Sequence, residues 1–382
     1  MSLLSRIALV LALLIVAAPA VWAAEPAEPP AEKPDPFKVP DGTPEELLKY
    51  IAGLRSERPE KRDRDSVMEF QKKLFTAMSE AAIKALRANP SDEEAEQAVQ
   101  VASQSLSILG RMGDTEAGKR LAGLLEELEK AGKKPLVRQL RGVMLGMRLR
   151  ETGVGNAAKL KEVIGEVKTF LGEGPVGMAE AQLVMTAGQM AEYAGDTDFA
   201  VETYTAFGKL LAESKDEQVG RLAKMFDGIV RRLKLVGQEI KIEGAYVNGD
   251  AFDLKKFAGK VVLVDFWATW CGPCRAEVPN MKKAYEGYRN KGFEIVGISL
   301  DHDREPLEKY LKEQEIPWAI LYQEGGRNAN ADYYGVMGIP TMILVGKDGK
   351  VVSTKARGEE LNKQLEALLG PPEEKPEKKE DK

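Results

Sequence analysis

Residues 264–274 read Val-Asp-Phe-Trp-Ala-Thr-Trp-Cys-Gly-Pro-Cys, and this stretch decides the fold of the C-terminal part of the chain. An apolar run of strand type precedes it and a helical pattern follows it. A helix that begins here would place Cys271 beside unpaired backbone N–H groups. These groups and the helix dipole favour an anion, which lowers the thiol pKa from ~8.5 toward ~7 in Cys-X-X-Cys motifs. Cys271 is therefore the expected nucleophile.

Cys271 and Cys274 are the only two cysteines of the chain, and their spacing predicts a redox pair. Cys271 would attack a disulfide to form a mixed disulfide, which Cys274 would then resolve. A zinc site would need four ligands, and the chain adds a single histidine to its two cysteines. A purely structural disulfide closing so short a loop would constrain the unfolded chain little. We expect no metal ion and no cofactor.

Short β-type runs alternate with helical stretches after Gly237, which predicts an α/β domain over residues 237–370. The helical stretches include residues 305–315. The expected strands contain residues 261–264, 293–298, 318–322 and 342–345.

The motif residues, with Pro279 in the following helix and Gly-Ile-Pro-Thr at residues 338–341, resemble thioredoxin. Two additions point to one group within the thioredoxin-like proteins. They are a hairpin-like lead-in at residues 244–260 and an extra helix and strand between residues 301 and 334. Together they are similar to the extracytoplasmic TlpA/ResA-like thiol-disulfide oxidoreductases. The resemblance covers residues 237–369 and does not extend to the N-terminal half.

This resemblance implies roles for individual residues. Cys271 would attack and Cys274 would resolve, while Pro340 would be a cis-proline that leaves the Ile339 backbone free to pair with a substrate strand. Asp265 would be a buried acid whose raised pKa lets it accept the Cys274 proton. The alternatives are an ordinary trans turn at Pro340 and a purely structural carboxyl at Asp265.

The remaining site residues are expected to shape the contact surface around the pair, and they are Trp270, Gly272, Pro273 and Thr341. Trp267 is expected to be packing, and we assign no role to His302. One departure concerns the proton route. Thioredoxin pairs its buried acid with a lysine on the neighbouring strand, and residues 295–298 contain none.

The N-terminus reads as a secretory signal over residues 1–23. Arg6 precedes an uncharged apolar run, residues 7–18, and small residues around Ala23 suit cleavage after that position. An uncleaved membrane anchor is the alternative, since residues 7–24 approach a spanning length. Either interpretation places the chain outside the cytoplasm, most simply in the periplasm, where disulfide chemistry operates.

Helical periodicity dominates residues 44–236 and predicts an all-α domain, either a bundle or a paired-helix repeat of tetratricopeptide type. Gly-Asp or Gly-Asn pairs recur near residues 113, 155 and 195, but glycine-containing turns between ordinary helices would explain them equally well. Helix starts are expected after Thr43 and Ser91. Proline-rich residues 24–43 predict a stiff, extended linker, and residues 371–382 a disordered charged tail.

Length and charge complete the prediction. At 382 residues two domains are expected, and a net charge of -5 argues against nucleic-acid binding. The leading hypothesis is an enzyme that reduces disulfides in extracytoplasmic partner proteins, supplied with electrons by a membrane protein. A thiol peroxidase of peroxiredoxin type is one alternative. Another is an interaction scaffold whose helical domain recruits the partner protein.

Overall fold

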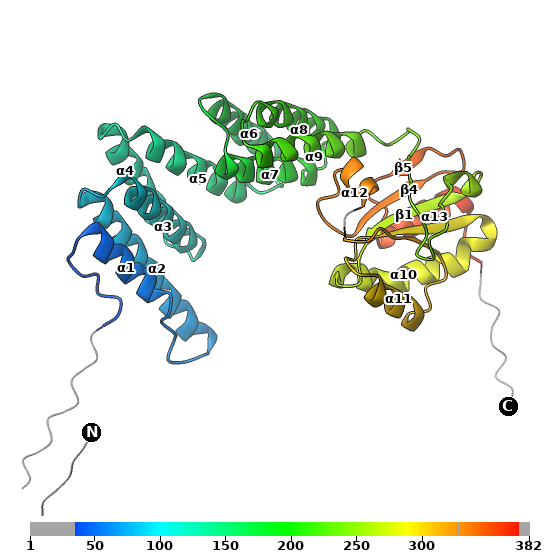
Figure 1. Cartoon of the computed structure of the whole chain (residues 1–382), viewed down its shortest axis with the longest axis horizontal. Helices are drawn as coiled ribbons and strands as arrows, with labels where there is room; N and C mark the ends of the chain where they lie inside the picture. The colour runs from blue at the N-terminus through cyan, green and yellow to red at the C-terminus, as the bar shows by residue number, and fades with distance from the viewer. Residues whose placement is uncertain (1–34, 327, 374–382) are drawn as a thin grey trace, which may run out of the picture.

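The computed structural model describes residues 35–326 and 328–373 (Figure 1). An extended array of helices leads into an α/β part, which agrees with the predicted fold classes. The predicted signal sequence, residues 1–23, and the first part of the linker lie outside the described residues. Among the helices that the structure describes, none combines the length and the apolar character needed to cross a membrane.

Helices α1 to α9 form the N-terminal part. Thr43 and Ser91 cap α1 and α3 as predicted, each within a reciprocal capping box with a glutamate three residues on. The nine helices of this described part are Pro44–Leu54, Arg64–Arg87, Asp92–Arg111, Ala117–Lys130, Lys134–Thr152, Ala157–Gly172, Met178–Tyr193, Thr197–Ala212 and Glu217–Leu233.

The helical part contains two apolar cores that share one helix. The first core is built on α1 to α4 and takes Leu136 and Leu140 from the start of α5. The second is built on α6 to α9 and takes Leu145 and Leu149 from the end of the same helix. Helix α5 therefore joins two otherwise separate packing units, and α9 carries the second unit to the α/β part.

Glycines close the turns that the sequence singled out. Gly113 and Gly195 have φ values of +90° and +84°, where a side chain would be strained. Asp196 then caps α8 by accepting a hydrogen bond from the Phe199 amide at 3.0 Å. Gly155 does not have a positive φ, but Asn156 after it caps α6 by accepting a hydrogen bond from the Lys159 amide at 3.1 Å. The repeat interpretation stays a prediction.

The α/β part is one five-stranded sheet with strand order β3-β2-β1-β4-β5. β1 pairs with β2 in parallel and with β4 antiparallel. Strand β5 was not predicted. The strands are β1 Val261–Trp267, β2 Phe293–Ser299, β3 Ala319–Leu321, β4 Thr341–Val345 and β5 Val351–Ser353. The helices are α10 Gly272–Tyr288, α11 Arg304–Glu313, α12 Ala329–Tyr333 and α13 Glu359–Leu369, with 3-10 turns at Leu254–Phe257 and Arg289–Lys291.

Every residue of β1 is buried, because this central strand is covered on both faces. Leu263 and Trp267 belong to the core that contains both cysteines, whereas Val264 and Phe266 belong to the core on the opposite face. Since side chains alternate along a strand, Asp265 faces the cysteine side. The period of β1 thus places one carboxyl beneath the start of α10.

The predicted linker and the predicted tail both contain packed residues. Phe37, in the predicted linker, makes an edge-to-face ring contact with Phe70 at 5.4 Å. In the predicted tail, the Glu373 amide donates to the Gly287 carbonyl at 2.9 Å. A Cβ on Gly287 would lie 2.9 Å from Pro372, so this glycine makes room for the chain. The described ends of the predicted linker and tail therefore contact the neighbouring domains, and the predicted domain bounds stay a prediction.

Candidate active site

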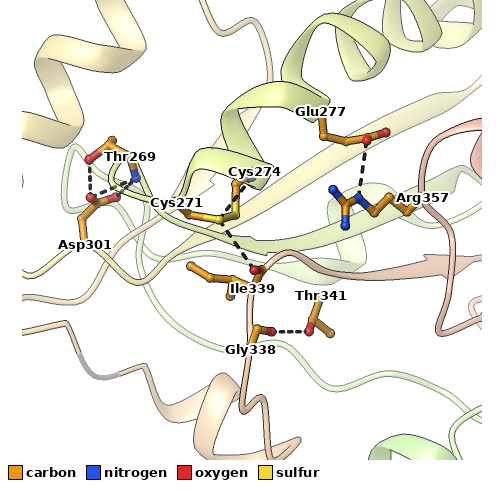
Figure 2. Close-up of a disulfide and its surroundings, with 9 residues drawn as sticks. All are labelled: Thr269, Cys271, Cys274, Glu277, Asp301, Gly338, Ile339, Thr341 and Arg357. Atoms are coloured by element: carbon orange, nitrogen blue, oxygen red, sulfur yellow. Dashed lines mark hydrogen bonds and ion pairs between the residues drawn. A yellow bond between two sulfur atoms is a disulfide. The ribbon is translucent and has the colours of Figure 1, made fainter. Parts of the chain in front are cut away.

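Cys271 and Cys274 form a disulfide at the N-terminus of α10 (Figure 2). Cys271 is the N-cap residue, and its Sγ accepts a hydrogen bond from the Cys274 amide at 3.2 Å. Pro273 fits the first turn because its missing N–H would have no helical partner there. The sulfur of Cys271 thus lies where an anion is stabilised, as the motif predicted.

The segment between α12 and β4 faces the disulfide. The Ile339–Pro340 peptide bond is cis, and the Ile339 carbonyl oxygen lies 3.7 Å from the Cys271 Sγ. Thr341 donates a hydrogen bond from Oγ1 to the Gly338 carbonyl at 2.7 Å. Residues 338–340, which we call the facing loop, are half-buried to exposed and so present backbone next to the sulfur.

Three of the residues predicted to shape the contact surface are exposed next to the disulfide. Trp270 is 66% exposed, and Gly272 and Pro273 are exposed as well. Trp267 is buried and packs against Tyr310, as predicted. A large exposed indole beside a disulfide offers an apolar contact to a partner.

A buried aspartate at the end of β2 holds the loop that precedes Cys271. Asp301 accepts hydrogen bonds from the Thr269 amide at 3.1 Å and from the Thr269 hydroxyl at 2.5 Å. It also accepts one from the Ser299 hydroxyl at 2.8 Å. The sequence analysis missed Asp301. The sequence could have indicated Asp301, because it follows one predicted strand while Thr269 follows another, and the carboxyl ends of neighbouring parallel strands meet at one edge of a sheet.

Asp265 is 5% exposed, and its Oδ1 has no hydrogen-bond partner among the described residues. The pKa of Asp265 is raised to about 8, mainly by burial. The negative charge of Glu277 also raises this pKa, and the positive charge of Arg357 lowers it. Asp265 is therefore mostly protonated at neutral pH, in the range where a carboxyl can exchange protons with a thiol.

Glu277 was also missed, although it lies one helical turn beyond Cys274 on α10. Its Oε1 accepts hydrogen bonds from the Gly358 amide at 2.9 Å and from Asn280 at 2.8 Å. Its Oε2 lies 3.6 Å from Nε of Arg357 (Figure 2). Two carboxyl groups thus share this side of the disulfide, and the arginine lies beside Glu277.

Arg357 supplies a positive charge near Asp265, although residues 295–298 lack the lysine that thioredoxin has on the neighbouring strand. Asp265 pairs with Gly297 on β2, so the neighbouring strand supplies no cation there, as the sequence indicated. Arg357 instead comes from the segment between β5 and α13 and lowers the pKa of Asp265. His302, to which we assigned no role, is exposed beside Asp303.

Comparison with known proteins places this site in a family. Residues 234–369 match the Redoxin family model. The thiol-disulfide oxidoreductase ResA of Bacillus thuringiensis is 36% identical over 123 residues, which are 32% of this chain and 69% of that protein. This chain belongs to the ResA-like thiol-disulfide oxidoreductases. The ResA protein of Oceanobacillus iheyensis is 28% identical over 152 residues, 40% of this chain and 72% of that protein.

Two solved structures are also similar to the α/β part of this ResA-like protein. One is the thioredoxin domain of a thiol-disulfide oxidoreductase from Bacteroides vulgatus, with 34% identity, a TM-score of 0.33, and coverage of 35% of this chain and 97% of that chain. The other is a thiol:disulfide interchange protein of the thioredoxin family from Chlorobium tepidum, with 28% identity, a TM-score of 0.30, and coverage of 34% and 93%.

Proposed function

We propose that this ResA-like protein reduces disulfides in extracytoplasmic partner proteins through the dithiol of Cys271 and Cys274. The observation that carries the proposal is the placement of the Cys271 Sγ. It lies at the N-terminus of α10 and 3.7 Å from the Ile339 carbonyl of the facing loop. A substrate segment paired with the Ile339 backbone would present its disulfide to this sulfur.

The exchange proceeds in two balanced steps. The Cys271 thiolate attacks one substrate sulfur, a mixed disulfide forms, and the other substrate sulfur leaves as a thiolate. Cys274 then loses its proton and attacks the Cys271 Sγ, which releases the second substrate thiolate and forms the Cys271–Cys274 disulfide. Two electrons pass from the protein to the substrate, so a reductant must regenerate the dithiol. We assign that task to a membrane electron-donor protein.

Asp265 is suited to the second step. Its pKa of about 8 is close to that of an ordinary thiol, so proton transfer between Cys274 and this carboxyl, directly or through water, costs little free energy. Arg357 and Glu277 together set how readily Asp265 gives up the proton. Arg357 takes the place of the cation that the neighbouring strand lacks, and Glu277 opposes its effect on the pKa of Asp265.

The direction of electron flow is tested by the reduction potential of the pair, followed by tryptophan fluorescence in a dithiothreitol redox buffer. Trp267 and Trp270 lie near enough to serve as reporters. A potential near about -270 mV supports a reductase, whereas a value of about -120 to -180 mV would reverse the proposed direction.

The identity of the nucleophile is tested by trapping. The Cys274→Ala variant should accumulate mixed disulfides with partner proteins, because the resolving thiol is gone. The matched Cys271→Ala variant should trap none. Equal trapping by both variants would refute the assigned roles.

The compartment is part of the proposal and rests on residues 1–23. We expect the mature protein to fractionate with the periplasm and to begin at Ala24, which mass spectrometry of the N-terminal peptide measures. A mature protein retaining Arg6 in the membrane fraction would support the anchor instead. A cytoplasmic protein would refute the location.

A further inference from the structure

The last helix of the helical part touches the α/β part backbone to backbone. A Cβ on Gly228 of α9 would lie 2.6 Å from the Gly335 amide nitrogen and 3.0 Å from the Asp332 carbonyl oxygen. The contact is reciprocal, since a Cβ on Gly335 would lie 2.4 Å from the Ile229 nitrogen and 2.6 Å from the Met225 carbonyl oxygen. Two glycines therefore allow α9 to pack against the end of α12 with no side chain between them.

Side chains extend this contact on both sides of the glycines. The Arg231 guanidinium lies 3.9 Å from the centre of the Tyr333 ring and donates a hydrogen bond to the Tyr333 carbonyl. Met337 packs against the second helical core, which contains Phe226. We call Gly228, Arg231, Gly335 and Met337 the seam.

Helix α12 and its C-cap residue are also held by the segment that follows α9. The Lys241 amide donates to the Tyr334 hydroxyl at 2.8 Å, and that hydroxyl donates to the Lys241 carbonyl at 3.1 Å. Asn330 exchanges two further hydrogen bonds with the backbone of Glu243, at 2.7 and 3.0 Å. Because these hydrogen bonds hold α12 in addition to its contacts with α9, a change in α9 cannot be absorbed by a free movement of α12.

The seam leads directly into the facing loop. Gly335 and Met337 are separated from Pro340 by a few residues of chain, and the Ile339 carbonyl lies 3.7 Å from the Cys271 Sγ. One end of this loop is anchored in the seam and the other in β4, which pairs with β1. The position of the Ile339 backbone relative to the sulfur thus depends on the helical part.

We propose that the seam positions the facing loop opposite Cys271, so that the helical part is a component of substrate engagement. The inference rests on the proposed function, because it concerns how a protein disulfide is held at that same site. The seam residues are positioning residues: they act through Ile339 and Pro340 and touch neither sulfur.

The proposal predicts a selective defect. A protein substrate needs the Ile339 backbone to align its disulfide, whereas a small aromatic disulfide needs only access to Cys271. Misplacing bound groups by about 1 Å can cost about 100-fold in rate. Disturbing the seam should therefore slow the reduction of protein disulfides and spare the reduction of small ones.

Helix α9 offers a matched pair of variants for the full-length protein. Gly228→Ala inserts a methyl group into the seam, whereas a Cβ on Gly220 of the same helix meets nothing within 4 Å. Both changes raise helix propensity equally. We expect Gly228→Ala to lower kcat/KM for insulin reduction by about tenfold or more while aromatic-disulfide reduction changes less than about twofold. Gly220→Ala should change neither.

Arg231→Gln provides a second variant should Gly228→Ala fail to fold, as judged by circular dichroism, and the same selective loss is expected of it. The proposal would be overturned if a folded seam variant reduced insulin with the same kcat/KM as Gly220→Ala. It would also be overturned if kcat/KM fell equally for insulin and for the aromatic disulfide. A wild-type protein that cannot reduce insulin would refute the proposed function itself.

Discussion

Replacing Asp265 with asparagine should make stability less dependent on pH. The carboxyl is buried, and its pKa is raised from 3.8 to about 8. At pH 7 the folded protein holds this group protonated while the unfolded chain ionises it. That difference costs the folded state about 4 kcal/mol, at about 1.4 kcal/mol for each pH unit above the unfolded pKa.

The sign follows from the raised pKa. Between pH 4 and pH 8 the folded protein binds more protons than the unfolded chain, so the free energy of unfolding falls as the pH rises. Below pH 4 the free energy of unfolding no longer depends on the protonation of Asp265, and above pH 8 the full loss of stability caused by Asp265 has been reached. The asparagine side chain does not titrate, so the Asp265→Asn variant lacks this slope.

The difference between two pH values isolates the effect. Asparagine brings its own cost, because the Asp265 Oδ1 position offers no hydrogen-bond partner among the described residues and an amide placed there stays unsatisfied. This cost is the same at every pH. Relative to wild type, the variant should therefore gain about 3 kcal/mol in free energy of unfolding between pH 5 and pH 7.

Urea unfolding of the oxidised protein measures this gain. Tryptophan fluorescence is the suitable signal, because Trp267, Trp270 and Trp318 all lie in the α/β part. Glu277→Gln is the matched control: it should move the upper end of the window to lower pH, because it removes one cause of the raised pKa. Parallel stability curves for wild type and Asp265→Asn from pH 5 to pH 7 would refute the reasoning.

Three further predictions test the surroundings of the site and the helical core. Arg357→Gln should raise the pKa of Asp265, seen as a shift of the same stability window to higher pH, whereas Lys355→Gln should leave the window unchanged. Asp301→Asn weakens the bonds that hold the active-site loop and should cost about 2 kcal/mol in the urea assay; an unchanged midpoint would contradict this. Glu192→Gln leaves the largely buried Arg232 without its ion-pair partner. The free energy of unfolding should fall by about 2 kcal/mol, measured by circular dichroism of the helices.

The features that the sequence predicted well are governed by neighbours in the chain. The caps at Thr43 and Ser91 need only a glutamate three residues on, and the start of α10 needs only the motif itself. Apart from single polar residues such as Asp265, the central strands are runs of apolar residues and are visible as such in the sequence. Strand β5 was missed because it offers only two adjacent apolar residues, whereas β3, which is equally short, lies in a longer apolar run over residues 318–322.

The missed residues belong to contacts between distant parts of the chain. Arg357 reaches Glu277 only because the segment before α13 returns to the side of α10. Thioredoxin carries the cation on the strand beside its buried acid, and a sequence alone does not say which other segment approaches Asp265. Asp301 is a milder case, since the sheet topology would have placed it beside Thr269.

The division of the helical part into two cores limits which helices can influence the active site. The seam contacts described come from α9, which belongs to the second core together with Phe226 and Ile229. The first core reaches that unit through α5, whose two ends pack into different cores. Packed side chains and rigid helices can carry coupling between distant sites. A partner bound at α8 or α9 would act on the seam directly, whereas one bound at α1 to α3 would act through the helices that join the two cores, α5 among them.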